Sequence, residues 1–298
     1  MRNKIRLTVQ LLFTIVTNGY LYGFLNGKIY RGGLKYACVP GLNCYSCPAA
    51  SGACPIGAFQ AVVGSSKFSF SYYITGFLIL LGVLLGRFIC GFLCPFGWFQ
   101  ELLHKIPTKK LSTKRLKPLT YLKYAVLLVM VVLLPAFLVN DVGMGDPFFC
   151  KYLCPQGVLE GAIPLSLANA GIRAALGKLF TWKFSILLSV IALSVLFYRP
   201  FCKWLCPLGA FYALFNRVSL FQMKVDKSKC ISCGKCARAC KMDVDVTKTP
   251  NHTECIRCGM CIRACPTKAV CFRYGFGDGK DKAKAAETLQ TNNNNREE

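Results

Sequence analysis

The sequence has few histidines and no signature of nucleotide or acid–base chemistry. His104 and His252 are its only histidines, and neither lies in a predicted membrane span, so a bis-histidine haem inside the membrane is excluded. The chain contains no P-loop, no glycine-rich dinucleotide fingerprint and no acid and base residues at a catalytic spacing. It therefore lacks the marks of a nucleotide-dependent or acid–base enzyme.

Acidic residues are also scarce, which leaves a strongly basic chain. Thirteen Asp and Glu stand against 37 Lys and Arg, giving a formal net charge of +24. The basic residues form no dense stripe with interleaved aromatics but stand at the ends of hydrophobic segments, so we expect no nucleic-acid partner. Cytoplasmic loops rich in Lys and Arg, and a basic host for anionic clusters, account for the charge.

Long apolar stretches dominate the composition. Apolar residues make up 54% of the chain, and the mean hydropathy is +0.41. Four stretches approach the roughly 20 residues that a hydrocarbon core requires, and they predict membrane spans at 5–25, 71–89, 119–139 and 184–201. No small-x-small cleavage site follows the first of them, so we expect it to be retained as an anchor.

The charge of the loops predicts the orientation. The loop after the second span holds Lys105, Lys109, Lys110, Lys114, Arg115 and Lys117 against only Glu101. This is a cytoplasmic signature, so both termini should be cytoplasmic and loops 26–70 and 140–183 should lie outside. We expect a multi-pass protein of a bacterial or archaeal cytoplasmic membrane, in contact with lipid. The apolar segment 157–172 is predicted to be a short interfacial or re-entrant helix.

Two cysteine runs near the end of the chain have the spacing of a two-cluster bacterial ferredoxin. In that pattern the fourth cysteine of each run binds the other cluster. One [4Fe–4S] cluster is therefore expected on Cys230, Cys233, Cys236 and Cys265, and a second on Cys255, Cys258, Cys261 and Cys240. Zinc also accepts Cys-x2-Cys pairs, but the interlocked order of eight cysteines favours iron–sulfur.

Upstream, Cys-Pro-x-Gly occurs four times, beginning at Cys54, Cys94, Cys154 and Cys206. The last three copies have another cysteine four residues earlier, at Cys90, Cys150 and Cys202. Together with the predicted spans, this repeat indicates two halves that cross the membrane in the same direction. A pseudo-twofold axis along the membrane normal would relate them. An inner-leaflet [4Fe–4S] cluster is expected where the halves meet, on Cys90, Cys94, Cys202 and Cys206.

The residues around these cysteines favour an anionic cluster. Proline suits the first position of a helix, and such a helix directs its free N–H groups back at the preceding cysteine. Glycines at Gly97, Gly157 and Gly209 should let the backbone approach the inorganic sulfide. Arg87, just before the inner motif, could pair with cluster thiolates or anchor the chain at the membrane interface.

A second membrane cluster is predicted in the outer leaflet. Cys150, Cys154 and Cys54 are its expected ligands, and the fourth is Cys47 or Cys44, of which we favour Cys47. The two outer cysteines left over could form a disulfide on the oxidising side. The chain would then hold four [4Fe–4S] clusters.

These observations predict a membrane α-helical fold. It should comprise four transmembrane helices in two pseudo-symmetric halves (1–221), a C-terminal α+β two-cluster ferredoxin module (222–274) and a disordered tail (275–298).

The stretch Gly86-Arg87-Phe88-x-Cys90-Gly91-x2-Cys94-Pro95-x-Gly97, its later copies and the ferredoxin tail resemble the NapH/NosR/CcoG-like membrane polyferredoxin superfamily. Residues 40–48 (PGLNCYSCP) also look like a subgroup of these proteins. The resemblance implies an inner-membrane iron–sulfur protein that relays electrons between cytoplasmic or quinone pools and an extracytoplasmic acceptor.

Taken together, the motifs predict a transmembrane electron conduit, the electron-transfer component of an oxidoreductase system. Its expected partners are a cytoplasmic donor (a ferredoxin or a reductase) and an extracytoplasmic redox acceptor, with a flavoprotein as one candidate. Two alternatives stay open: a quinol dehydrogenase subunit that binds quinone, and a factor for metal-centre assembly or copper delivery.

Overall fold

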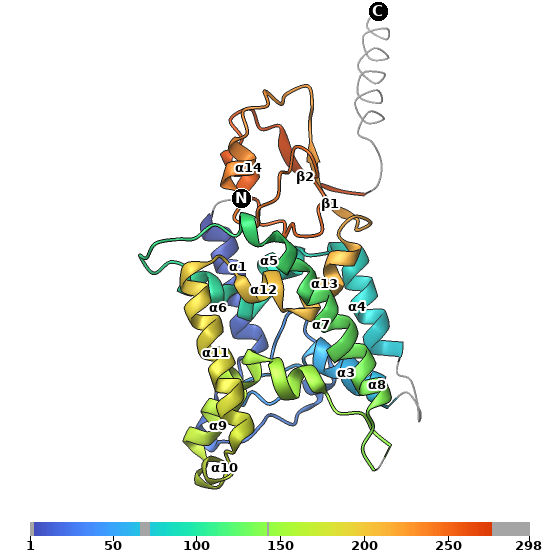
Figure 1. Cartoon of the computed structure of the whole chain (residues 1–298), viewed down its shortest axis with the longest axis vertical. Coiled ribbons are helices and arrows are strands. Elements are labelled where there is room, and N and C mark those ends of the chain that lie inside the picture. Colours follow the sequence, from blue (N-terminus) through green and yellow to red (C-terminus); the bar gives the residue numbers. More distant parts are fainter. Residues whose placement is uncertain (1–2, 66–71, 142, 276–298) are drawn as a thin grey trace, which may run out of the picture.

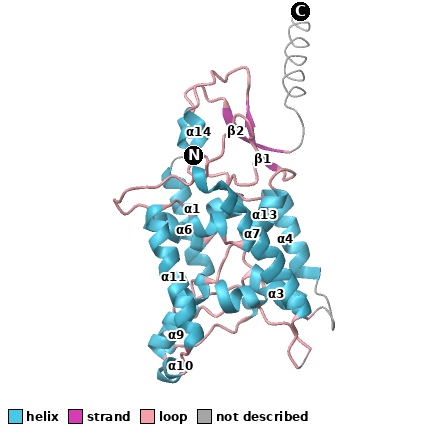
Figure 2. Ribbon diagram, in the orientation of Figure 1, coloured by secondary structure: helices cyan, strands magenta, loops and turns pink. Residues whose placement is uncertain are grey.

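The computed structural model describes residues 3–65, 72–141 and 143–275. Helices form one bundle, and a small module with the strands sits on one end of it (Figures 1 and 2). The first elements are α1 (Asn3–Thr17), α2 (Tyr22–Asn26), the 3-10 helix η1 (Gly33–Tyr36), α3 (Pro55–Gly64), α4 (Tyr72–Leu85), α5 (Phe88–Phe92) and α6 (Pro95–Leu103).

The second part of the bundle contains 3-10 and π-helical segments between its α-helices. Its elements are the 3-10 helix η2 (Lys114–Tyr121), α7 (Leu122–Val126), the π-helix η3 (Leu127–Leu133), α8 (Leu134–Phe137), the π-helices η4 (Phe149–Leu153) and η5 (Gly157–Ala162), α9 (Ile163–Ala168), α10 (Ala170–Ala174), α11 (Lys178–Leu196), α12 (Pro200–Trp204) and α13 (Pro207–Phe215). Pro118 lies inside η2, and Pro135 is the second residue of α8. Because proline has no amide hydrogen to donate, departures from regular α-helix are expected near such residues.

Two helical stretches are long and apolar enough to cross a membrane. They are Lys114–Phe137, of 24 residues, and Lys178–Leu196, of 19 residues. Only 22% and 17% of their apolar windows are buried inside the protein, so most of this apolar surface faces outward, as lipid contact requires. The described apolar parts of the first two predicted spans, Ile5–Thr17 and Tyr72–Leu85, are shorter, and these two spans stay predictions.

The fourth predicted span ends earlier than the apolar pattern suggested. The helix α11 stops at Leu196, and Arg199 adopts a left-handed backbone with φ of 51° before Pro200 begins α12. This sharp break matters for the site, because it places Cys202 on a separate short helix. The segment 157–172 forms η5, α9 and part of α10, none of spanning length.

The module is built on a two-stranded antiparallel sheet, β1 (Phe221–Val225) and β2 (Val270–Tyr274), with the central pair Met223 and Phe272. Between the strands lie two five-residue helices that contact each other, α14 (Lys235–Ala239) and α15 (Met260–Ala264). The predicted tail lies outside the described residues from position 276 onward.

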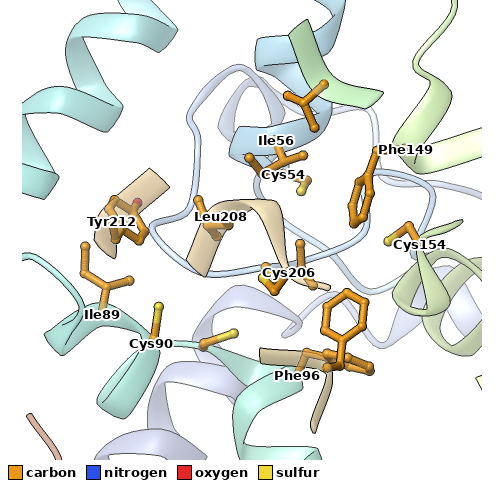
Figure 3. Packing of buried hydrophobic residues seen from close by; sticks show 14 of the residues in the cluster. Cys54, Ile56, Ile89, Cys90, Phe96, Phe149, Cys154, Cys206, Leu208 and Tyr212 are labelled. Atoms are coloured by element: carbon orange, nitrogen blue, oxygen red, sulfur yellow. The ribbon is translucent and has the colours of Figure 1, made fainter. Parts of the chain in front are cut away.

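One hydrophobic core runs through the bundle and into the module. It contains Cys54, Cys154, Cys90 and Cys206, and reaches Ile256. Figure 3 shows Cys54 and Cys154 on either side of the Phe149 ring, with Cys206 and Cys90 farther along the same core. Most of the predicted bundle cysteines therefore line one buried interior, whereas Cys236, Cys255, Cys261 and Cys265 of the module belong to a second, smaller core.

Candidate iron–sulfur sites

The eight cysteines of the module separate into two cavities. One is lined by Cys230, Cys233, Cys236 and Cys265, and the other by Cys240, Cys255, Cys258 and Cys261. These are the two crossed sets that the spacing predicts. Their role as ligands stays a prediction.

The two cysteine loops of the module share one backbone conformation. Ser232 and Gly234 have positive φ in the first loop, as do Arg257 and Gly259 in the second. Consecutive left-handed and right-handed residues turn successive amide groups toward one side and form an anion-binding hollow. Each loop therefore folds as expected for a loop that wraps an anionic group.

At the module end of the bundle, the two halves of the chain bring four cysteines together. Cys90 lies in α5, Cys94 precedes α6, Cys202 lies in α12 and Cys206 precedes α13. All four are buried, and the thiol of Cys206 lies close enough to the other three to interact electrostatically. This is the convergence that the predicted inner cluster requires.

A second group of cysteines gathers in the half of the bundle away from the module. The thiol of Cys150 lies near those of Cys154, Cys54 and Cys44. The amide of Cys44 donates to Glu160 Oε2 at 3.0 Å, which holds this loop against η5. Three of these four are the predicted outer ligands.

The expectation that Cys47 completes this outer group is not supported by the fold, which places Cys44 there. A tight turn separates the two residues, with the amide of Cys47 donating to the Cys44 carbonyl. The turn directs Cys47 toward Asn18 Oδ1 and into a small cluster with Ala49 and Ala50. Each of the nineteen cysteines, all within the described ranges, is free of a disulfide, so the suggested outer disulfide is absent.

Each Cys-Pro-x-Gly motif has the same local geometry at its cysteine. Pro55, Pro95 and Pro207 begin helices as predicted. The amide of the motif glycine interacts with the cysteine sulfur at Gly57, Gly97, Gly157 and Gly209, with the Gly209 amide 3.4 Å from Cys206 Sγ. The sequence pattern therefore encodes an N–H donor for each sulfur, and Gly57 joins the three predicted glycines.

Two buried glutamines, which sequence reasoning missed, make the same contacts in the two membrane sites. Gln60 Nε2 donates to Cys150 Sγ at 3.2 Å, and Gln100 Nε2 donates to Cys202 Sγ at 3.1 Å. Both stand six residues after the motif cysteine. Their common offset is the signal that could have identified them.

Basic side chains also cross between the halves. Arg87 is fully buried, so it is not an interfacial anchor, and its Nη2 donates to the Cys202 carbonyl at 3.3 Å. Arg199 donates in return to the Cys90 carbonyl. Each arginine precedes its own motif by three residues, a match that sequence reasoning missed for Arg199.

Lysines occupy the corresponding places at the outer group. Lys183 Nζ donates to the Cys150 carbonyl at 2.9 Å, and Lys35 Nζ donates to the Ala50 carbonyl at 2.8 Å. Ala50 is the repeat counterpart of Cys90 because it lies four residues before Cys54. The two groups therefore share a scheme of cationic donors, with arginine at one and lysine at the other.

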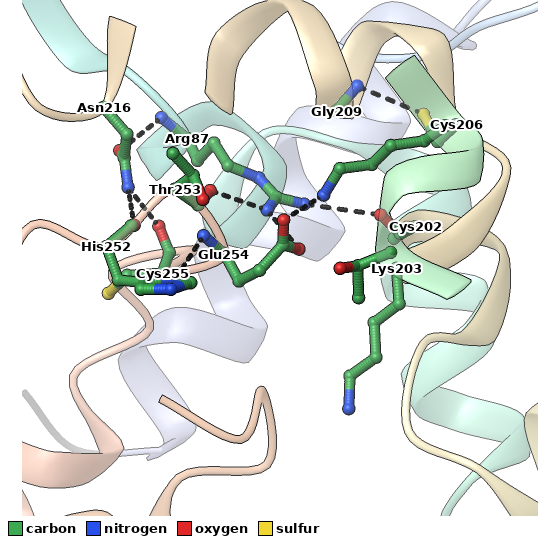
Figure 4. Close-up of polar contacts among 12 residues, drawn as sticks. Arg87, Cys202, Lys203, Cys206, Gly209, Asn216, His252, Thr253, Glu254 and Cys255 are labelled. Atoms are coloured by element: carbon green, nitrogen blue, oxygen red, sulfur yellow. Dashed lines mark hydrogen bonds and ion pairs between the residues drawn. The ribbon is translucent and has the colours of Figure 1, made fainter. Parts of the chain in front are cut away.

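Buried ion pairs fasten the module to the bundle (Figure 4). Glu254 of the module pairs with Arg87 at 2.9 Å and with Lys123. Burial favours a raised pKa for Glu254, but these two cations outweigh it and hold the pKa below its ordinary value. Asn216 donates to the carbonyls of His252 and Cys255 at 2.6 and 3.0 Å. The loop that carries Cys255 is thus fixed against the bundle.

Family models match most of this architecture. A 4Fe-4S binding domain matches residues 52–72, 69–114, 123–163 and 179–228, and a 4Fe-4S dicluster domain matches residues 222–266. An uncharacterized protein of Methanocaldococcus jannaschii is 31% identical over 209 residues, which cover 67% of this chain and 77% of that protein.

Named relatives match over shorter parts of their length. The ferredoxin-type protein NapH of Haemophilus influenzae is 32% identical over 37% of this chain and 52% of that protein. The regulatory protein NosR of Pseudomonas aeruginosa is 26% identical over 54% of this chain and 21% of that protein. The chain belongs to the NapH/NosR-like polyferredoxin family. As a member of this polyferredoxin family, it is an iron–sulfur electron-transfer protein. No solved structure matches it.

The cysteine groups of this polyferredoxin suit [4Fe–4S] clusters better than single metal ions. Among the residues that the structure describes, no three His, Cys, Asp or Glu side chains converge as the ligands of one ion would. The four sulfurs around a cluster bind different irons and so lie farther apart than the ligands of one zinc ion. The N–H donors directed at cysteine sulfur also suit thiolate ligands, which accept hydrogen bonds.

Proposed function

We propose that the protein conducts electrons across a cytoplasmic membrane, from a cytoplasmic donor to an extracytoplasmic acceptor, with both termini cytoplasmic. Four [4Fe–4S] clusters, two in the module and one in each leaflet, would supply one-electron transfer when bound. The observation that carries the proposal is the presence of one cysteine group near each end of an apolar bundle, within a single core. The matched contacts of Gln60 and Gln100 support the two-half architecture.

The docking of the module supports an order for the four centres. Cys258 lies near Arg6 and Tyr198 of the bundle, and Cys240 and Cys258 pack against the bundle core. Their set is therefore the proximal one. The set that includes Cys230 is distal, beside Ile231, which is 64% exposed. Electrons would enter at the distal set and pass through the proximal set and the inner group to the outer group.

The surface around the distal set supports an acidic donor. Its exposed basic residues are Lys227, Lys229, Lys235, Arg238, Lys248 and Lys268. Arg238 also donates to the Cys233 carbonyl at 2.9 Å, which places its charge at the cysteine loop. Complementary charge accelerates encounter between redox partners, and salt weakens it.

Cluster counting and vectorial transfer test the proposal. We expect the purified full chain to contain iron and sulfide for four [4Fe–4S] clusters, with matching EPR signals. In sealed liposomes, externally added reduced ferredoxin should bleach a trapped dye only when the module faces outward. Fewer than three clusters per chain, or bleaching that is independent of orientation, would contradict the conduit.

A cavity favours quinol dehydrogenation as a second candidate function. It measures about 290 Å³ and lies where the start of η2 meets the module. Its lining combines apolar Met242 and Val244 with polar Lys117, Lys203 and His252, next to the loops that carry Cys240 and Cys255. A quinone head group would match this mixture of apolar and polar lining residues. If a quinone analogue leaves cluster reduction by menaquinol unchanged, this candidate fails.

A further inference from the structure

The two glutamines that follow the first pair of Cys-Pro motifs use both ends of the side-chain amide. Gln60 Oε1 accepts from the Phe149 amide at 2.9 Å while Gln60 Nε2 faces Cys150 Sγ. Gln100 Oε1 accepts from the Phe201 amide at 3.2 Å while Gln100 Nε2 faces Cys202 Sγ. Each glutamine therefore bridges a cysteine sulfur and the amide of the residue just before that cysteine.

Hydrogen-bond chemistry determines which end of each amide faces the sulfur. A backbone N–H can only donate, so it must face the amide oxygen of the glutamine. The NH2 group then points at the cysteine, and the sulfur acts as acceptor. Both glutamines are fully buried, so water does not compete for these bonds, and the low local dielectric strengthens them.

In the other two motifs, the residue six positions after the cysteine also bonds to the backbone of a distant segment. Neither of these residues contacts a cysteine sulfur in this way. Six residues after Cys154 stands Glu160, which accepts from the Cys44 amide at 3.0 Å. Six residues after Cys206 stands Tyr212, whose hydroxyl donates to the Pro40 carbonyl at 3.0 Å. Of the four residues at this position, only the two glutamines donate a side-chain N–H to a cysteine sulfur, one in each cysteine group.

We propose that Gln60 and Gln100 are paired positioning residues, each of which orients one cysteine and sets the reduction potential of a single membrane cluster. Gln60 acts on the outer cluster and Gln100 on the inner one. This inference rests on the proposed function, because it presupposes both clusters. Hydrogen bonds to ligand sulfur stabilise the reduced, more negative cluster and raise its potential, so losing a donor should lower that potential.

EPR-monitored potentiometry of the purified full chain tests the proposal. In Gln60→Leu the potential of one cluster should fall while the other three stay in place, and in Gln100→Leu a different single cluster should shift. Gln10→Leu is the matched control, because Gln10 is also buried but donates to the Gly91 carbonyl at 2.9 Å and not to sulfur. It should leave all four potentials unchanged.

A second pair of variants tests the proposal in case a leucine variant loses its cluster. Gln60→Glu and Gln100→Glu keep an oxygen for the Phe149 or Phe201 amide but remove the N–H donor, so the potential should still fall. Loss of only the corresponding cluster also supports positioning. Unchanged potentials, a shift of the same cluster by both variants, or loss of every cluster would overturn the inference. Fewer than three clusters in the unmodified chain would instead refute the proposed function.

Discussion

At the residue scale, the outer group shows how one turn decides between two neighbouring thiols. Cys44 and Cys47 stand three residues apart, in a stretch where either could serve as the fourth ligand. Glu160 holds the Cys44 amide, and Asn18 lies beside the Cys47 thiol. The Cys44 amide is thus held by a carboxylate more than a hundred residues away in the sequence.

This placement predicts different outcomes for two neighbouring substitutions. Cys44→Ala should lower iron and acid-labile sulfide by one cluster, because the outer group loses a thiolate. Cys47→Ala should retain the full content. Iron and sulfide analysis with EPR measures both variants, and equal loss in the two would contradict the assignment of Cys44.

The motif glycines allow a second comparison at this scale. A Cβ at Gly97 would lie 2.8 Å from Arg199 Nη1, whereas at Gly209 the nearest atom is 3.5 Å away. Gly97→Ala should displace the guanidinium that contacts the Cys90 carbonyl and cost about 1–3 kcal/mol through overpacking. Gly209→Ala should be tolerated. Thermal unfolding in detergent compares them, and an equal loss of stability would show that Arg199 can move aside.

At the scale of elements, short helices and the breaks between them place the motif cysteines next to backbone amide groups, which an uninterrupted helix would not do. The helices α5, η4 and α12 each end just before a motif cysteine, and a new helix begins at the proline that follows, so the cysteine between them faces several amide groups. The left-handed Arg199 turns the chain after α11, and α12 then contacts α6 through Gln100 and the Phe96–Phe201 ring pair. An uninterrupted helix through 201 would place Cys202 elsewhere.

The outward apolar face of α11 leads to a prediction about insertion. Leu188 lies near the middle of α11 and is 51% exposed, whereas Leu179 lies near its start and is 41% exposed. Arginine at the centre of a membrane helix costs about 3 kcal/mol, but near an end its side chain can reach water. Leu188→Arg should therefore reduce membrane insertion, measured by carbonate extraction, while Leu179→Arg should not. Equal insertion of the two would argue against a spanning α11.

At the scale of the whole molecule, the module and the bundle act as one unit because charges are buried between them. Glu254 lies against two cations whose side chains have no exposed surface, Arg87 and Lys123. Removing one partner of such a group leaves the others buried and uncompensated. The interface therefore depends on a carboxylate that the surrounding sequence does not single out.

Neutralising that carboxylate should loosen the module. Glu254→Gln should lower stability by about 3–5 kcal/mol, the cost of leaving buried charge unpaired. Asp226→Asn, which removes an exposed partner of Lys229 at 3.8 Å, should change little because solvent screens that pair. Thermal unfolding and the rate at which protease releases the module measure both. If the two variants behave alike, the buried pairs do not hold the interface.

Features that depend on local spacing and composition could be predicted from the amino-acid pattern. Cysteine intervals predicted the two crossed sets in the module, because neighbouring ligands must reach one small group from a short loop. Cys-Pro predicted the helix starts at Pro55, Pro95 and Pro207, because proline lacks the amide hydrogen that other positions need. Apolar run length predicted the two long helices, and the repeat predicted which halves should meet.

Features that depend on contacts between distant segments became visible only in the folded chain. It placed Cys44 beside the other outer thiols and brought Gln60 and Gln100 to sulfurs about a hundred residues away. It also brought Arg199 to the Cys90 carbonyl and turned the Cys240 set toward the bundle. A glutamine or an arginine has no spacing rule of its own, because its partner is defined by packing. Such contacts depend on how the helices pack against one another, and the local sequence pattern does not specify that packing.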